Sequence, residues 1–393
     1  MEYQNMRLAD YTEEAQDGER GSFDAPFLLL TMLLLTIGVI MVLSASFARA
    51  YYDIANETDG NATYYFMKQL IFAALGIVVM FFCSRFPMSF YRQISFTVLL
   101  VSVGLLVLVL IIGTKVNDAR RWINLGFTTI QPSEIAKISI ILFFSTLICK
   151  FKDKMATIKY GLAPFATIWA VIVGLLILEP HFSGAVIIIT IGAVMLFLGG
   201  VRLKWFLIGG GAVAGLAAVV FSVFDYTSKR ISAWLDPFSD MSDTGYQIVQ
   251  SLFSVGSGGL TGLGLGQGRQ KYLYLPEEHN DYIFSVICEE LGFIGAILIL
   301  LLFALLIIRG YWLALHARDR YSFLVCAGIT TLLAVQVILN IAVVTNLLPA
   351  TGISLPFFSY GGTALLIQMA ETGIILSMSR DIPQKKQDYR TED

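Results

Sequence analysis

The chain has 393 residues, of which 56% are hydrophobic and only 14% charged, and its mean hydropathy is +0.72. Soluble globular proteins are about half apolar and about a quarter charged. The composition therefore excludes an ordinary soluble enzyme, a disordered protein and a nucleic-acid-binding protein. Because long apolar stretches recur along the whole length, the sequence predicts an all-α, polytopic membrane protein. The 27 basic and 29 acidic residues nearly cancel, so only their placement is informative.

Ten stretches approach the roughly 20 apolar residues that a membrane-spanning helix needs. We expect these spans near 25–48, 69–83, 94–113, 132–149, 162–178, 184–199, 205–224, 282–307, 322–345 and 361–379. The first follows an acidic segment and is too long for a cleaved signal peptide. The predicted organisation is a polar tail (1–24), a ten-helix membrane domain (25–379) and a second polar tail (380–393).

The basic residues predict the orientation of these spans. With the N-terminus in the cytoplasm, 17 Lys and Arg residues fall in inside segments and nine in outside segments, as the positive-inside rule requires. Both termini are then cytoplasmic, and residues 225–281 form an extracellular loop between helices 7 and 8. This loop is long and rich in aromatic residues, so we expect it to fold on the outer membrane face, with a short amphipathic helix near Tyr246–Val255.

Ionisable residues in or at the edge of a span are candidates for function, because charge is costly in a membrane. Glu134 and Lys137 follow Pro132 at the start of the fourth span, and their spacing places them on one helix face. Two interpretations stay open: an ion pair that ties this helix to its neighbours, or a site wall in which Lys137 faces an anionic ligand.

Arg120 and Arg121 lie just before this helix, on the outside and beside Trp122. Two adjacent arginines can bind phosphate in a bidentate manner. The alternative is an interfacial anchor with a salt bridge to Asp118.

Asp281 stands at the end of the long outer loop and opens the eighth span, followed on the same predicted helix by Glu289 and Glu290. A partly desolvated carboxylate at the mouth of a membrane site suits a general base, although a helix-capping role needs no chemistry. Glu277 and Glu278 have the pattern of solvated loop charges.

Two further runs lie on the outer side. The glycine-rich run 256–268 matches neither a Walker loop nor a dinucleotide fingerprint. Its backbone amides could cradle a phosphate, but we favour a packing role, in which glycines let a re-entrant turn approach the helices. The Pro- and Gly-containing run 348–362, which includes Ser359, indicates a broken helix beside a cavity.

No hydrolase triad, nucleotide site or Cys/His metal spacing is present, and the four cysteines lie in or at the ends of apolar segments as expected for packing residues. What remains is an outward-facing groove with basic groups, carboxylates and apolar walls. Such a groove suits a lipid-linked, anionic, sugar-bearing substrate.

At Asp118–Ile123 with Gln131–Lys137, Tyr246–Gly266, Leu275–Gly292 and Pro349–Gly362, the sequence resembles the FtsW/RodA family of bacterial SEDS (shape, elongation, division and sporulation) proteins. The resemblance implies ten transmembrane helices and a peptidoglycan glycosyltransferase that polymerises lipid II, the undecaprenyl-pyrophosphate-linked disaccharide-peptide. It also implies a class B penicillin-binding protein (an FtsI-like transpeptidase) and other divisome membrane proteins as partners. The chain is most similar to the division (FtsW) branch, with elongation (RodA) and sporulation (SpoVE) members as alternatives.

The resemblance also assigns roles to residues. The family's catalytic aspartate matches Asp281, and its intramembrane Glu and Lys match Glu134 and Lys137. The expected substrate-binding residues are Arg120, Arg121, Glu134, Lys137, His279, Glu289 and Ser359. No metal cage is visible, but Mg²⁺ or another divalent cation bound with the substrate pyrophosphate stays open.

One departure concerns the turn after the fifth span, where the family often has Pro-Asp-Phe/Leu-Gly. This chain reads Glu179-Pro180-His181-Phe182-Ser183-Gly184, which puts a ligand role for the turn in doubt.

Two other classes of function compete with the enzyme. A lipid II flippase or transporter would also place ionisable residues in a helical bundle, although the candidates here gather at the outer end, which favours chemistry. A membrane scaffold would tolerate Asp281→Ala, whereas an enzyme would not.

Overall fold

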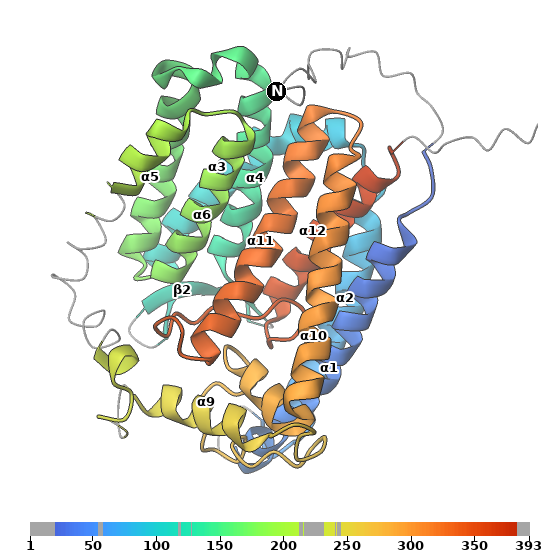
Figure 1. The fold of residues 1–393 in the computed structure, drawn as a ribbon, viewed down its shortest axis with the longest axis vertical. Coiled ribbons are helices and arrows are strands. Elements are labelled where there is room, and N and C mark those ends of the chain that lie inside the picture. Colours follow the sequence, from blue (N-terminus) through green and yellow to red (C-terminus); the bar gives the residue numbers. More distant parts are fainter. Residues whose placement is uncertain are drawn as a thin grey trace, which may run out of the picture.

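The computed structural model describes residues 20–53, 58–116, 119–126, 128–211, 215, 232–239, 241 and 245–382. Long helices lie side by side and alternate in direction (Figure 1). They are α1 (Ala25–Tyr52), α2 (Tyr64–Cys83), α3 (Met88–Ile112), α4 (Pro132–Phe151), α5 (Ala163–Leu178), α6 (Phe182–Leu198), α10 (Ile283–Leu315), α11 (Arg320–Val344) and α12 (Gly362–Ser379). The predicted all-α membrane fold is thereby confirmed, and six helical segments are long and apolar enough to cross a membrane. Most of the predicted seventh span, 205–224, lies outside the described residues.

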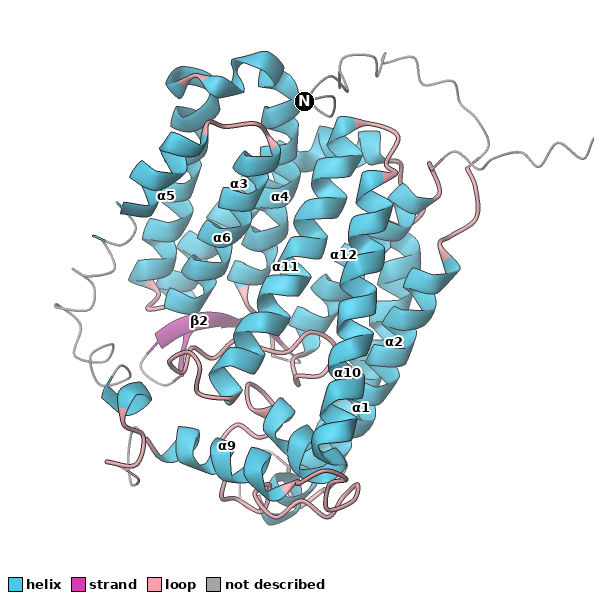
Figure 2. Ribbon diagram, in the orientation of Figure 1, coloured by secondary structure: helices cyan, strands magenta, loops and turns pink. Residues whose placement is uncertain are grey.

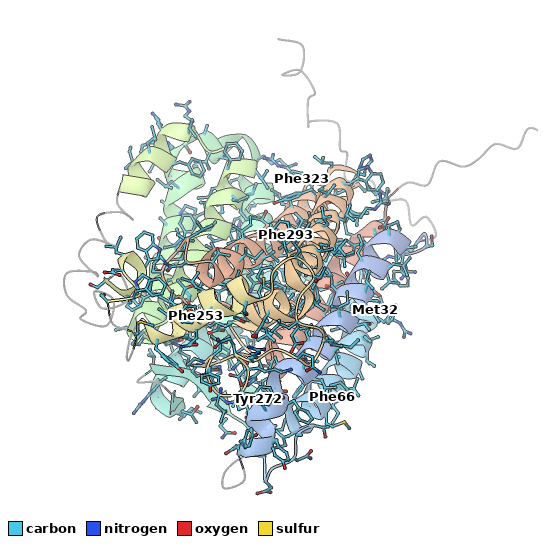
Figure 3. All side chains as sticks on the ribbon, turned by 60° about the horizontal axis from the view of Figure 1, so that its bottom comes forward. Met32, Phe66, Phe253, Tyr272, Phe293 and Phe323 are labelled. Atoms are coloured by element: carbon cyan, nitrogen blue, oxygen red, sulfur yellow. The ribbon has the colours of Figure 1, made fainter. Side chains whose placement is uncertain are left out.

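The long predicted loop folds across one end of the bundle. Its helix α9 (Tyr246–Ser257) lies at the end opposite the start of α1 (Figure 1), which confirms the helix predicted near Tyr246–Val255. Figure 3 turns this end forward and shows Phe253 of α9 and Tyr272 of the following loop there, and both side chains are exposed. We call this end the outer end, following the orientation predicted from the basic residues, and the opposite end the inner end.

A small antiparallel sheet joins α3 to α4, and sequence analysis missed it. Strands β1 (Thr114–Val116), β2 (Ala119–Asn124) and β3 (Thr129–Ile130) pair in the order β1-β2-β3 at the outer end (Figure 2). The strands are rich in Thr, Val, Ile and Trp, which suit pleated backbone. They are too short to produce a readable alternation of apolar and polar residues.

Helix α4 occupies the middle of the bundle, in contact with α3, α6, α11 and α12. Its small polar residues therefore bond within the protein: Ser139 Oγ lies 2.9 Å from Ser102 Oγ of α3. Hydrogen bonds of this kind link helices where no water is available. The central position also explains why the Glu134 and Lys137 side chains are buried.

Helix α10 breaks at Gly292, whose backbone adopts φ 68° and ψ −171°. The predicted single span 282–307 therefore consists of two helical parts. A break leaves backbone groups without partners, which membrane protein structures do not tolerate. The glycine-rich loop supplies the partners: Leu263 N donates to Glu289 O (3.0 Å), Gly264 N to Glu290 O (3.0 Å), Phe293 N to Gly259 O (2.9 Å) and Ile294 N to Leu260 O (3.1 Å).

These bonds require the loop backbone to approach the helix closely. A Cβ atom on Gly258 would lie 1.9 Å from the Cys288 carbonyl oxygen, and one on Gly262 would lie 2.1 Å from that of Glu290. Gly262 also has φ +79°, a region that L residues rarely adopt. The packing interpretation is thus confirmed for these two glycines.

We predict that Gly262→Ala destabilises the protein by about 2 kcal/mol or more, because it adds a left-handed residue penalty to a steric overlap. Thermal unfolding in detergent measures the effect. Gly256→Ala is the matched control, since a Cβ atom there meets nothing within 4 Å. Equal melting temperatures for the two variants would contradict the role of Gly262.

Candidate functional site

Asp281 lies at the outer end, immediately before α10, and its backbone is held by α11. Asn340 Nδ2 donates to Asp281 O (2.8 Å) and also to Ile353 O (2.7 Å). One amide thus joins Asp281 to the loop 348–362. The Asp281 carboxylate lies against Gly352 of that loop, where a Cβ atom would come within 3.1 Å of Oδ2. The side chain is partly exposed, as a group that must reach a substrate has to be.

The residues before Asp281 are fixed by the same loop. Ser359 Oγ donates to Asn280 O (2.8 Å) and accepts from Leu355 N (2.7 Å), and Tyr360 N donates to His279 O (2.8 Å). His279 and Ser359 therefore lie beside the segment that carries the candidate base. The described hydrogen bonds of the Ser359 hydroxyl are made to backbone groups and position them. Direct contact of His279 or Ser359 with a substrate stays a prediction.

Aromatic and charged contacts hold this segment against α1 and α2. The His279 ring lies 4.7 Å from the Tyr65 ring and 5.6 Å from the Tyr360 ring, between centroids. Glu278, expected to be a solvated loop charge, is instead only 1% exposed and bonds to Arg49 Nη1 at 3.1 Å. The prediction for Glu278 was wrong because its cation comes from α1, far away in the sequence.

Glu289 and Glu290 tie the glycine-rich loop to α10. The Glu289 carboxylate accepts from the backbone amides of Arg269 (2.9 Å) and Gln270 (3.3 Å). Glu290 forms a buried ion pair of 2.6 Å with Lys271. The predicted role of Glu289 in substrate binding stays a prediction, since its described bonds are made within the protein.

The intramembrane pair is present on α4. Lys137 Nζ lies 2.7 Å from Glu134 Oε2, with both side chains buried. Sequence analysis missed a third member, Glu371 of α12, which is 7% exposed and interacts electrostatically with both residues. Its signal was available, because it is an acidic residue inside a predicted span.

The two arginines of β2 diverge, since neighbouring side chains of a strand point to opposite faces. Arg121 Nη2 donates to Pro180 O in the turn between α5 and α6. Arg120 Nη1 donates to Leu110 O near the end of α3 (3.3 Å), and its side chain is exposed. The alternative salt bridge to Asp118 lies outside the described residues.

The turn Glu179–Gly184, whose sequence differs from the usual family pattern, makes a polar contact with Arg121 of β2. Burial raises the pKa of Glu179 to about 8, against the opposing effect of Arg121. Burial lowers the pKa of His181 to about 3, and Arg121 and Lys137 add to that effect. Arg121 contacts this turn and Lys137 lies near enough to influence His181 electrostatically, whereas Arg120 bonds to the end of α3.

The start of α12 lies between the part of the site around Asp281 and the part around the Glu134–Lys137 pair. Thr363 Oγ1 donates to Thr129 O of β3 (2.8 Å), while Tyr360 of the preceding loop bonds to His279. These two bonds connect the segment before Asp281, through the start of α12, to β3, the strand that leads into α4. Among the described residues no three His, Cys, Asp or Glu side chains gather as a metal site would need, and a divalent cation bound with the substrate stays a prediction.

Comparison with known proteins places the chain in a family. The model of the cell cycle protein family FtsW/RodA/SpoVE matches residues 25–384. This chain belongs to that family. It is 40% identical to stage V sporulation protein E of Bacillus subtilis over 92% of this chain and 98% of that protein. It is 41% identical to the probable peptidoglycan glycosyltransferase FtsW of Trichlorobacter lovleyi over 91% and 93%.

Solved structures agree in fold. A chain of a peptidoglycan synthase complex, from a structure on the coordination of polymerisation and crosslinking, matches with a TM-score of 0.76 and 26% identity over 92% of this chain and 99% of that one. The rod shape determining protein RodA of Thermus thermophilus matches with a TM-score of 0.67 and 27% identity over 92% and 98%. Together with the apolar helices, family membership makes this a multi-pass membrane protein.

We predict that Lys137→Met destabilises the protein by about 3–5 kcal/mol, because it leaves two buried carboxylates without their cation. The double variant Lys137→Met with Glu134→Gln should regain part of this loss, and thermal unfolding of both variants measures it. Additive losses would show that Glu134 and Lys137 do not act as a pair.

A second prediction concerns pH. The Glu179 pKa of about 8 lies above its ordinary value of 4.5, so the folded protein holds a proton that the unfolded chain releases between these values. The stability that this proton provides is therefore lost as pH rises from about 4.5 towards 8. The melting temperature of the wild type minus that of Glu179→Gln should fall between pH 5 and pH 8. A constant difference would mean that Glu179 is charged in the fold.

Proposed function

We propose that this protein is a peptidoglycan glycosyltransferase that polymerises lipid II on the outer face of the cytoplasmic membrane, for septal wall synthesis in division. The observation that carries the proposal is the position of Asp281. It is a partly exposed carboxylate whose backbone is fixed by Asn340, at the outer end of a fold whose relatives include proteins named as peptidoglycan glycosyltransferases. The elongation and sporulation roles are the alternatives within the same reaction class.

In this mechanism Asp281 acts as the general base. It takes the proton from the 4-hydroxyl of the acceptor sugar as that oxygen attacks the anomeric carbon of the donor. The bond from the anomeric carbon to the pyrophosphate breaks, and undecaprenyl pyrophosphate leaves with the electron pair. A single inverting displacement needs one base and no enzyme nucleophile.

Cations near the start of α4 would stabilise the leaving group. Lys137 and Arg121 both act electrostatically on His181 of the turn between α5 and α6, and cations fixed near developing charge lower a barrier without reorganisation. Arg120, which is exposed at the end of α3, is better placed to attract the anionic headgroup than to contact it in the transition state. Any divalent cation would add charge compensation at the pyrophosphate.

We further propose a class B penicillin-binding protein and other divisome membrane proteins as partners. A solved structure similar to this chain belongs to a peptidoglycan synthase complex. The outer loop exposes large apolar side chains on and after α9, including Phe253, Leu260 and Tyr272. Exposed apolar clusters of this kind mark protein or membrane contacts.

The buried group formed by Glu134, Lys137 and Glu371 favours a lipid II flippase as the second candidate, since transporters place ionisable residues inside the bundle. The two functions differ in where chemistry occurs. A flippase depends on the buried group and tolerates loss of Asp281, whereas the polymerase depends on Asp281.

We predict that Asp281→Asn lowers glycan formation from lipid II by about 100-fold or more, the usual contribution of a general base. Purified protein is combined with its penicillin-binding partner, and the polymer is resolved on a gel. Asp236→Asn is the matched control, because Asp236 is an exposed aspartate in the same outer loop. Unchanged polymer from Asp281→Asn would overturn the assignment, and lipid II movement without polymer would favour the flippase.

A further inference from the structure

The connection between α4 and α5, at the inner end, is folded rather than open. Residues Lys152–Ala156 form a short 3₁₀ helix, η2, and Ile158–Leu162 form a π-helical turn, η3. Met155 is buried between them, and a Cβ atom on Gly161 would lie 1.8 Å from the Met155 carbonyl oxygen. The side chains of this connection therefore project from a defined backbone.

These elements border an open cavity of about 370 Å³, within the size range of small-molecule sites. It is lined by Lys150, Phe151, Lys152, Lys154 and Tyr160. The Phe151 and Tyr160 rings lie 5.4 Å apart, between centroids. Three lysines thus line one open cavity together with two aromatic residues.

The positive charge of this cavity is not compensated within the described residues. Lys154 Nζ lies 5.3 Å and Lys159 Nζ 5.6 Å from the Tyr160 ring centroid, and no described carboxylate pairs with any of the four lysines. Asp153 is the only acidic residue between positions 150 and 160.

Several other basic residues of the inner end have partners. Each of four arginines bonds to an oxygen of the protein: Arg20 to Asp381, Arg309 to Asp24, Arg320 to Gly199 and Arg380 to Gly21. The positive-inside rule explains why basic residues gather at this end. It does not explain why three lysines that pair with no carboxylate in the described part of the chain line one cavity.

Exposed apolar side chains follow the cavity in the sequence, along η3 and α5. Ile158, between the lysines in sequence, is 52% exposed, and Val171 and Leu178 are exposed further along the same helical segment. This segment is one of the candidate membrane spans. A ligand with a charged head and an apolar tail could place each part in a matching environment.

We propose that this cavity binds the phosphate-bearing headgroup of an anionic phospholipid of the inner leaflet, with its acyl chains along Ile158 and α5. Lysine is a good point-charge ligand for phosphate, and basic pockets at the cytoplasmic ends of membrane helices bind anionic headgroups. The lysine stems also cover apolar surface while their ammonium groups reach the headgroup level. This site lies at the opposite end of the molecule from Asp281 and does not depend on the proposed enzymatic function.

The test uses the full chain in detergent, titrated with phosphatidylglycerol and followed by native mass spectrometry. The triple variant Lys150→Gln, Lys152→Gln, Lys154→Gln should bind at least tenfold more weakly than the wild type. The control Arg202→Gln, Lys204→Gln, Arg318→Gln removes the same charge from the inner end but leaves the cavity intact, and should bind within about twofold of the wild type. The charge-preserving triple Lys→Arg variant at 150, 152 and 154 should retain binding.

Each outcome decides the proposal. If both triple Gln variants bind phosphatidylglycerol equally more weakly than the wild type, binding depends only on the total positive charge of the inner end. That result would overturn the proposed site. If inorganic phosphate at equal concentration competes as well as phosphatidylglycerol, the ligand is a free phosphate and the lipid assignment fails. If the Lys→Arg variant loses binding while its melting temperature stays unchanged, positive charge does not recognise the headgroup. The proposal then fails.

Discussion

The outer half of this molecule depends on one constraint, that a broken helix in a membrane must find partners for the backbone groups it releases. The break at Gly292 meets this constraint through four backbone bonds from the glycine-rich loop. The first part of α10 therefore begins at Ile283, two residues after the candidate base, and ends just after Glu289 and Glu290. The Glu290 carboxylate accepts from Gly266 N and Gly268 N of the same loop, and that of Glu289 accepts from the next residue, Arg269. Glycines at 258 and 262 are required because the loop backbone must touch the helix backbone.

A second organising feature is the central helix α4. Its neighbours on several sides remove water from Glu134 and Lys137, so their charges act at short range and with little screening. Glu371 adds a second carboxylate to the same lysine. Buried charges of this kind seldom add stability compared with apolar residues. An ionisable group inside a membrane bundle is a functional candidate by default, which supports the role proposed above for Lys137 toward an anionic ligand.

Sequence analysis predicted the parts of the fold that follow from hydropathy, namely the long apolar helices that the structure describes and the amphipathic helix at Tyr246. The freedom of glycine backbone also predicted the packing role of Gly258 and Gly262. Sequence analysis also selected Asp281, because a carboxylate at a membrane mouth is unusual whatever its surroundings. It could not predict the break at Gly292, since one glycine in an apolar stretch is common. Nor could it predict that Arg120 and Arg121 diverge or that Glu278 is buried. These depend on strand geometry and on an arginine more than 200 positions away.

The double hydrogen bond from Asn340 has a consequence for how the site can move. The same amide holds the carbonyl of Asp281 and that of Ile353, so the base and the loop 348–362 form one mechanical unit. A motion that swings this loop outward would therefore break the Asn340 bond to Ile353, while the bond from Asn340 would still hold the Asp281 backbone on α11. The Asp281 carboxylate would then lose its contact with Gly352, so the wall beside the base is complete only while the loop stays bonded to Asn340.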